Sequence, residues 1–184
     1  MTAQEVRYRW TTHAFLRAAA AGVFDSRVEL VDGEVWPVVI GDWHGPTTMR
    51  IAYLLTAPDV LVTQQSLPTG DSLPDPDVWL RRTGARPSGA VSPRVSRWDA
   101  ADVLLVVEVS DETVAADLGD KARLYAAGGY PVYWVVTRTA LYEHTEPAAD
   151  GYRTVTRYGT GDEVRLQHGG AVLAVADLLD DPDA

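Results

Sequence analysis

The stretch Asp102–Tyr125, which reads DVLLVVEVSDETVAADLGDKARLY, decides the fold that we predict for this chain. Residues 103–107 are apolar without alternation, and such a run is typical of a strand that is covered on both faces. Glu108 then places a carboxylate at the C-terminal end of the strand. Residues 117–127 have the apolar spacing of a helix, and this helix carries Lys121. The sequence therefore predicts a buried strand that ends in an acid and is followed by a helix with a base.

Lys121 is the only lysine of the chain, whereas arginine occurs many times. It follows Asp117 by one helical turn, so one interpretation is a surface lysine paired with Asp117. In the other, its ammonium group compensates Glu108, because a charge at the end of a buried strand needs a partner. That pairing can be purely structural or part of a functional site, and the pattern leaves these interpretations open.

The composition indicates a globular protein with an acidic balance. A length of 184 residues, 46% of them apolar and 23% charged, suits a single domain over 1–184, with its core at about 10–178. The net charge of -10 argues against broad, sequence-independent binding to nucleic acid, since phosphate neutralisation supplies most of that affinity. The chain has no cysteine, which excludes disulfides, thiolate metal sites and a cysteine nucleophile. Any contact with nucleic acid must therefore be local.

The N-terminal decapeptide MTAQEVRYRW lacks the apolar segment of a signal peptide. No apolar run in the chain approaches the length that a bilayer requires. We therefore expect a cytoplasmic protein without a membrane segment.

Local signals place further helices and strands around the central unit. Thr11 or Thr12 can cap a helix, and Asp32-Gly33 predicts the turn of a hairpin over 27–40. A helix is expected over 47–57, and the segments after residue 140 alternate as antiparallel strands do. Asp180, Asp181 and Asp183 indicate a frayed acidic tail. Further strands are expected at 60–65, 78–82 and 132–136. The fold class is therefore α/β, with an antiparallel β extension at the C-terminus.

Three acids stand at turns or at the ends of predicted strands, namely Glu29, Asp77 and Glu108. Alternation turns Glu29 away from the core, toward solvent as the simpler expectation or into a cleft. Facing carboxylates repel each other, and a divalent cation relieves that repulsion. Mg²⁺ or Mn²⁺ suits such oxygen ligands, activates a bound water and offsets charge on phosphate oxygens. Phosphodiester hydrolysis is the natural use, with Lys121 acting as a charge rather than as a general base.

Basic and aromatic residues elsewhere give weaker signals. Residues 81–96 are rich in proline, glycine and serine, which predicts a flexible loop. They also contain four arginines and no acid, so this loop is either a solvated insertion or a phosphate contact. His44 stands at the start of a predicted helix, where a packing role is the usual one. His144 and His168 are expected on surface strands. Exposed tryptophans at an interface would favour a homodimer, although they are more simply core residues. The residues concerned are Trp36, Trp43 and Trp79.

The order of motifs resembles the Uma-two family of putative restriction endonucleases, a branch of the PD-(D/E)XK nuclease superfamily. ELVDGEV is followed by HG at a helix start, then by PDPDVWL, DVLLVVEVS, a D-x-x-x-K helix and YPVYWVV. The match covers residues from about 10 to about 178, nearly the whole chain. This resemblance implies a restriction-endonuclease-like mixed β-sheet flanked by helices, and magnesium-dependent cleavage of nucleic acid, with DNA as the expected substrate.

The resemblance also implies roles for single residues. Asp77 is similar to the PD aspartate and Glu108 to the acid of the (D/E)XK element, so both are the expected metal ligands. Ser110 stands where that element normally has its lysine, and Lys121 is similar to a lysine displaced onto the following helix. Glu29 resembles an early glutamate of the family, a further catalytic candidate.

Supporting and contacting residues complete the expected site. His44 and Asp117 are expected beside the metal ligands, and Arg81, Arg82 and Arg86 are the candidate contacts to nucleic acid. The acidic balance favours an alternative from another class, a catalytically inactive nuclease fold that serves as a binding or regulatory module.

Overall fold

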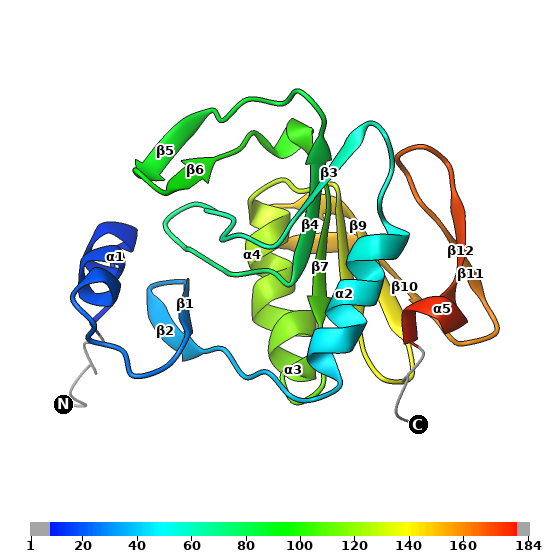
Figure 1. Cartoon of the computed structure of the whole chain (residues 1–184), viewed down its shortest axis with the longest axis horizontal. Coiled ribbons are helices and arrows are strands. Elements are labelled where there is room, and N and C mark those ends of the chain that lie inside the picture. Colours follow the sequence, from blue (N-terminus) through cyan, green and yellow to red (C-terminus); the bar gives the residue numbers. More distant parts are fainter. Residues whose placement is uncertain (1–7, 180–184) are drawn as a thin grey trace.

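A mixed sheet of six strands forms the body of the protein, for which the computed structural model describes residues 8–179 (Figure 1). Its strands are β3 (Val60–Thr63), β4 (Val78–Arg82), β7 (Val103–Val109), β8 (Val132–Val136), β9 (Leu141–Ala148) and β10 (Gly151–Tyr158). Their spatial order is β10-β9-β8-β7-β4-β3, in which β7 and β8 are parallel and all other neighbours antiparallel. The predicted mixed α/β sheet is confirmed.

Helices cover both faces of this sheet. The connection from β7 to β8 runs through α3 (Val114–Ala116), a π-helical turn η2 (Asp117–Lys121) and α4 (Ala122–Ala127). Side chains of α4 pack on one face, while α2 (His44–Leu54) and α5 (Val175–Leu179) contribute to the cluster on the other. The helix predicted over 117–127 is thus present, but it begins earlier and contains a widened turn.

The alternation of side chains along β7 determines which of them face α4. All seven of its residues are buried, so the strand is apolar on both faces as predicted. Leu105, Val107 and Val109 pack on the α2 side, whereas Val106 packs on the α4 side. Since alternate residues of a strand share a face, Glu108 also points toward α4.

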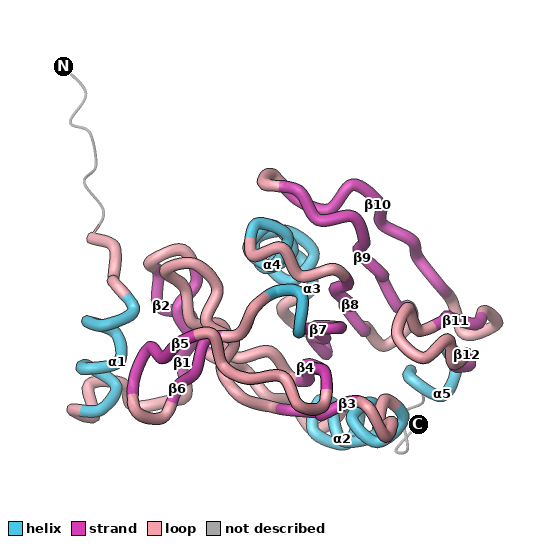
Figure 2. The backbone as a smooth tube through the Cα atoms, turned by 90° about the horizontal axis from the view of Figure 1, so that it is seen from above, coloured by secondary structure: helices cyan, strands magenta, loops and turns pink. Residues whose placement is uncertain are grey.

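An N-terminal lobe packs beside the sheet (Figure 2). Its small apolar cluster is formed by Phe15, Leu30 and Leu73, with Val95 packed against them. Leu30 and Leu73 exchange two backbone hydrogen bonds of 3.2 and 2.8 Å, which fix the lobe to the segment that leads into β4. The elements of the lobe are α1 (Thr12–Ala20), β1 (Val28–Val31), β2 (Glu34–Pro37), β5 (Gly89–Ser92) and β6 (Val95–Arg97).

Local capping and turn signals formed as predicted. The hydroxyl of Thr11 accepts a hydrogen bond from the backbone of Ala14 at 3.2 Å and so caps α1. Asp32 and Gly33 both have positive φ angles, 47° and 78°, as a type I′ turn between β1 and β2 requires. The Leu30 side of β1 faces the cluster of the lobe, so the side that carries Glu29 faces elsewhere.

The C-terminal extension continues with the hairpin β11 (Glu163–Arg165) and β12 (Val172–Ala174), whose strands are antiparallel. A 3-10 turn η1 (Ala100–Asp102) precedes β7. The acidic tail predicted at residues 180–183 lies outside the described residues.

The predictions for residues 81–96 and for His168 are wrong. Residues 81–96 are not a flexible loop, because Arg81 and Arg82 belong to β4 and the rest leads into the β5–β6 hairpin. His168 is half-buried in a turn after β11 rather than on a strand. Trp43 and Trp79 are only 4% and 1% exposed, so they are core residues, as the simpler expectation had it, and Trp36 is half-buried.

His144, predicted at the surface, is buried on β9 with 3% of its surface exposed. Its ring packs against Tyr133 and Tyr152, with centroids 5.3 and 5.7 Å away. Burial lowers the pKa of His144 below its usual value, since an imidazolium would lose its hydration there. The neutral ring is therefore the form that the fold accommodates.

Stability should fall more steeply in acid for the wild type than for His144→Phe. The folded-state pKa of His144 lies below 6.5, so the unfolded chain binds more protons as the pH falls through that range, and stability is lost. Thermal unfolding between about pH 7 and about pH 5 measures this difference, with exposed His13→Phe as the control. Parallel curves for wild type and His144→Phe would show that His144 does not titrate differently on folding.

Candidate functional site

The register of the sheet brings two distant acids together. Val78 of β4 pairs with Val107 of β7, so Asp77, one residue earlier, stands opposite Glu108. Directly opposed residues of antiparallel strands share a face and approach closely. Oδ2 of Asp77 also accepts the N–H of Val109 at 2.7 Å, which holds this carboxylate at the C-terminal end of β7. The predicted convergence of Asp77 and Glu108 is therefore present.

Lys121 is buried in this site rather than exposed on its helix. Its Nζ lies 3.0 Å from Oε1 of Glu108 and 2.9 Å from Oε1 of Glu29. The distance to Oδ1 of Asp117, its expected surface partner, is longer at 3.7 Å. The interpretation of Lys121 as a surface lysine is wrong, and its pairing with Glu108 is present.

Asp117 anchors the turn that carries the lysine. Its Oδ2 accepts hydrogen bonds from the hydroxyls of Ser110 at 2.7 Å and Thr113 at 2.6 Å. Its backbone carbonyl oxygen accepts a hydrogen bond of 3.0 Å from the buried hydroxyl of Tyr133. Ser110 thus holds the turn on which Lys121 lies. Widened π turns are often found at functional sites.

Glu29 reaches the site from the lobe, and the simpler expectation that it faces solvent is wrong. Its side chain is 5% exposed, and Oε2 accepts the backbone N–H of Asp75 at 3.0 Å while Oε1 faces Lys121. The cleft alternative was the correct one. No local pattern could have decided this, because it depends on how the β1–β2 hairpin packs against the segment before β4.

His44 and Tyr125 each hold one of the two acids. Nε2 of His44, the first residue of α2, lies 2.9 Å from Oδ1 of Asp77. The buried hydroxyl of Tyr125 donates to Oε1 of Glu108 at 2.9 Å. Sequence reasoning did not single out Tyr125 as a residue of the site. Its spacing of four residues from Lys121 was the available signal, because such residues share a helix face.

Burial and crowding make the site electrostatically unusual. Burial raises the pKa of Glu108 well above its usual range, and the neighbouring carboxylates raise it further, although Lys121 opposes them. Burial alone would lower the pKa of Lys121, but Glu108, Glu29 and Asp117 together raise it well above its usual value. Lys121 is therefore a permanent cation at neutral pH and no general base.

These side chains line a small cleft of about 40 Å³. Its wall contains the carboxylates of Glu29, Asp77, Glu108 and Asp117, with Lys121 as the lysine that faces them. Another acid of the wall, Asp75, is paired with Arg27 at 3.0 Å. Four carboxylates against one ammonium leave excess negative charge, which a divalent cation can compensate.

The donor set fits one particular class of cation. Residues 8–179 contain no group of three or more His, Cys, Asp or Glu side chains arranged to hold a metal ion. Mg²⁺ is usually held by one or two carboxylates together with water and substrate phosphate, and it needs no such cage. Asp77 and Glu108 match that smaller set: Lys121 and Tyr125 both donate to Oε1 of Glu108, and within residues 8–179 no hydrogen-bond donor engages Oε2.

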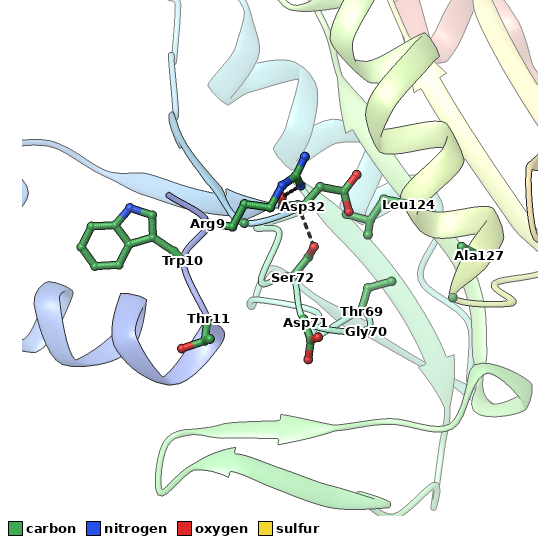
Figure 3. A pocket seen from close by; sticks show the side chains of 12 residues that line it. Arg9, Trp10, Thr11, Asp32, Thr69, Gly70, Asp71, Ser72, Leu124 and Ala127 are labelled. Atoms are coloured by element: carbon green, nitrogen blue, oxygen red, sulfur yellow. Dashed lines mark hydrogen bonds between the residues drawn. The ribbon is translucent and has the colours of Figure 1, made fainter. Parts of the chain in front are cut away.

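A larger cleft of about 520 Å³ lies beside the turn of the β1–β2 hairpin (Figure 3). Arg9, Asp32 and Asp71 contribute charged groups to its wall, and Leu124 and Gly128 close it from the α4 side. None of the predicted catalytic residues lines it. The larger volume is thus separate from the acids and the lysine.

The predicted arginine contacts lie away from the acids. Asp77 precedes β4 and Arg82 ends it, so about 17 Å of extended strand separate them. The guanidinium of Arg81 lies over the ring of Trp98, 4.2 Å from its centroid. Arg82 and Arg86 are exposed.

Comparison with known families identifies the chain. The model of the Uma2 family, described as a putative restriction endonuclease, matches residues 21–176. The chain belongs to the Uma2 family. The region matched contains every charged residue of the cleft and the whole strand-helix unit around β7.

One solved structure supports the Uma2 fold. The crystal structure of a putative nuclease belonging to DUF820 from Anabaena variabilis ATCC 29413 superposes with a TM-score of 0.68 at 12% sequence identity. The superposition covers 92% of this chain and 97% of that one. The comparison with curated proteins gave no match. None of the helices within residues 8–179 combines the length and the apolar character needed to span a bilayer.

Proposed function

We propose that this Uma2 protein is a metal-dependent endonuclease that hydrolyses phosphodiester bonds of nucleic acid, with DNA as the favoured substrate. The observation that carries the proposal is the meeting of Asp77, Glu108 and Lys121 in one cleft, from three separate segments of the chain. Family membership supports the same reaction class.

Asp77 and Glu108 would hold Mg²⁺ or Mn²⁺. When bound, such an ion lowers the pKa of a water molecule and offsets charge on the phosphate oxygens. Val109 and His44 fix the orientation of Asp77 through its two oxygens. Tyr125 fixes Glu108 in the same way, so neither carboxylate has to be reoriented at the moment of reaction.

Lys121 supplies a fixed positive charge beside the reacting phosphate. Its raised pKa keeps it protonated, so it stabilises negative charge that develops in the transition state rather than taking up a proton. Glu29 and Asp117 position Lys121, because their carboxylates lie on different segments of the chain and both attract its ammonium group. In this arrangement Glu29 acts through Lys121.

The inactive binding module keeps one supporting observation. Lys121 already pairs with Glu29 and Glu108, so part of the acidic charge is compensated without any ion. A cleft maintained only for stability would show the same pairs. Cleavage assays on single-stranded and double-stranded DNA and RNA, each with Mg²⁺ and with Mn²⁺, separate the two functions.

Asp77→Asn should weaken Mn²⁺ binding by about 10-fold to 100-fold and lower cleavage by about 1000-fold. The amide retains an oxygen for the N–H of Val109, so the fold should persist, but one anionic ligand is lost. Titration calorimetry measures the affinity and plasmid nicking measures the activity. Asp75→Asn is the matched control, because Asp75 lies on the same segment and pairs with Arg27 and Ser66.

Equal Mn²⁺ affinity in wild type and Asp77→Asn would show that Asp77 is not a metal ligand. Loss of binding in Asp75→Asn alone would move the site to the Arg27 side of the cleft. Wild-type protein that cleaves none of the four substrates, yet forms a stable complex with one of them, would establish the binding module instead.

A further inference from the structure

The segment that contains β5 and β6 has a charge opposite to that of the chain. Residues 81–97 include five arginines and no acidic residue, whereas the whole chain carries a net charge of -10. In Figure 1 the β5–β6 hairpin projects sideways from the sheet, on the same side as α1. It is therefore a local basic surface on an acidic protein.

Two of the five arginines hold this hairpin in place. Arg81 stacks on Trp98, with its guanidinium carbon 4.2 Å from the ring centroid. Arg97 donates a hydrogen bond of 3.1 Å to the carbonyl oxygen of Gly70, on the segment between β3 and β4. Both guanidinium groups are thus already used, and Arg81, expected to contact nucleic acid, has a structural partner instead.

Two others, Arg86 and Arg94, are exposed to solvent. Arg94 lies in the turn between β5 and β6, and Arg86 lies on the segment that leads into β5, both of them exposed. Within residues 8–179 neither guanidinium group has a hydrogen bond or an ion pair. Exposed arginines that pair with a nearby acid do occur here, as Arg123 does with Asp120. Arg86 and Arg94 therefore stay available for an external anion.

We propose that the β5–β6 hairpin, through Arg86 and Arg94, is a contact surface for the phosphate backbone of double-stranded nucleic acid. The inference rests on the proposed function for the class of partner. The segment that leads to this surface leaves β4 at Arg82, about 17 Å along the strand from Asp77, which corresponds to about five phosphates of one nucleic-acid strand. A duplex held at the cleft would extend over this distance.

The composition of the hairpin favours nucleic acid over a lipid surface. None of the large apolar side chains that are exposed among the described residues lies between residues 81 and 98. A membrane-binding surface normally adds such side chains to its basic charge. Ser88, Ser92 and Ser96 instead bring hydroxyl groups to the hairpin and to the residue before it, and hydroxyls commonly donate to phosphate oxygens.

The test compares two double variants that remove equal charge from the full-length protein. Arg86→Gln with Arg94→Gln empties the proposed surface, while Arg123→Gln with Arg153→Gln removes exposed arginines that pair with Asp120 and Asp150. Fluorescence anisotropy measures binding to a DNA duplex of about 20 base pairs in EDTA, where no metal supports cleavage, over a range of salt concentrations. Thermal unfolding checks that each variant folds.

The hairpin variant should bind about 10-fold more weakly at about 50 mM salt, and its salt slope should decrease by about 2, or about 0.9 for each lost phosphate contact. The control variant should stay within about twofold of the wild type. Equal losses in both variants, or no loss in the hairpin variant, would overturn the proposal. Wild-type protein that binds anionic lipid vesicles but no duplex would overturn it as well.

The two proposals fail in different ways. If the wild-type protein cleaves no substrate but its duplex binding depends on Arg86 and Arg94, the contact surface is supported and the nuclease function is refuted. If the hairpin variant binds and cleaves as the wild type does, the nuclease function is supported and the contact surface is refuted.

Discussion

Lys121→Met should destabilise the protein by about 3–5 kcal/mol and abolish cleavage of nucleic acid. The change removes the ammonium group that lies within 3.0 Å of both Glu29 and Glu108, while the methionine keeps most of the apolar volume. The carboxylates then remain buried without a cation, which costs more than the pair contributes when intact. The same loss deprives the phosphate of its fixed positive neighbour.

The destabilisation should depend on pH in a defined direction. The folded-state pKa of Lys121 lies above its unfolded value of 10.5, so its contribution is fully present below pH 10.5 and is lost only in stronger alkali. In the variant the unpaired carboxylates favour protonation, so acid should recover part of its stability. Urea unfolding at several pH values measures both effects, and Arg123→Met, an exposed change two residues away, is the control. A variant as stable as the control would show that Lys121 does not compensate the acids.

Glu108→Gln should act in opposite directions on stability and on activity. Its pKa is raised by burial, so the anion is the form that the fold tolerates poorly. A group with a raised folded-state pKa contributes stability in acid that is lost as the pH rises through that value. At neutral pH the neutral glutamine should therefore increase the free energy of unfolding by about 1 kcal/mol, the size typical of relieving a strained functional group.

The same Glu108→Gln change should lower cleavage by about 1000-fold and weaken Mn²⁺ binding, because an amide oxygen replaces an anionic ligand. Glu143→Gln is the matched control, since Glu143 is also a buried strand carboxylate, bonded to Trp134 and Tyr158 at 3.1 Å. That variant should lose stability and keep its activity. A Glu108→Gln protein that cleaves normally would assign Glu108 a structural role.

Local patterns predicted the elements that build the site. The apolar run at 103–107 and the helical spacing after it are properties of neighbouring residues, and both formed as expected. The turn at Asp32-Gly33 depends on the φ angles of two residues and was also predictable. Elements that depend only on neighbouring residues could therefore be predicted from the sequence.

Long-range packing decided the rest. Because β7 is apolar on both faces, its sequence could not show which side Glu108 faces, and only pairing with β4 and α4 fixes this. Glu29 is buried by the docking of the lobe, which involves Leu30 and Leu73 across 43 positions of sequence. His144 looked like a surface residue because its strand alternates, yet aromatic neighbours from other segments cover it.

The arginine-rich segment shows a further limit of composition. Proline, glycine and serine over 81–96 indicated a loop, but pairing of Gly89–Ser92 with Val95–Arg97 made a hairpin. Cross-strand pairing and the contact of Val95 with the lobe stabilise it, and neither is visible in a single sequence window. In the folded hairpin, Arg81 and Arg97 make structural contacts, whereas Arg86 and Arg94 are exposed to solvent.

A crystal structure of the protein soaked with Mn²⁺, with the ion located by its anomalous scattering, tests the central claim most directly. The expected result is a single strong peak bonded to carboxylate oxygens of both Asp77 and Glu108, with Lys121 still beside it. A peak at other residues, or no peak at saturating Mn²⁺, would contradict the assignment of this cleft as the metal site of a nuclease.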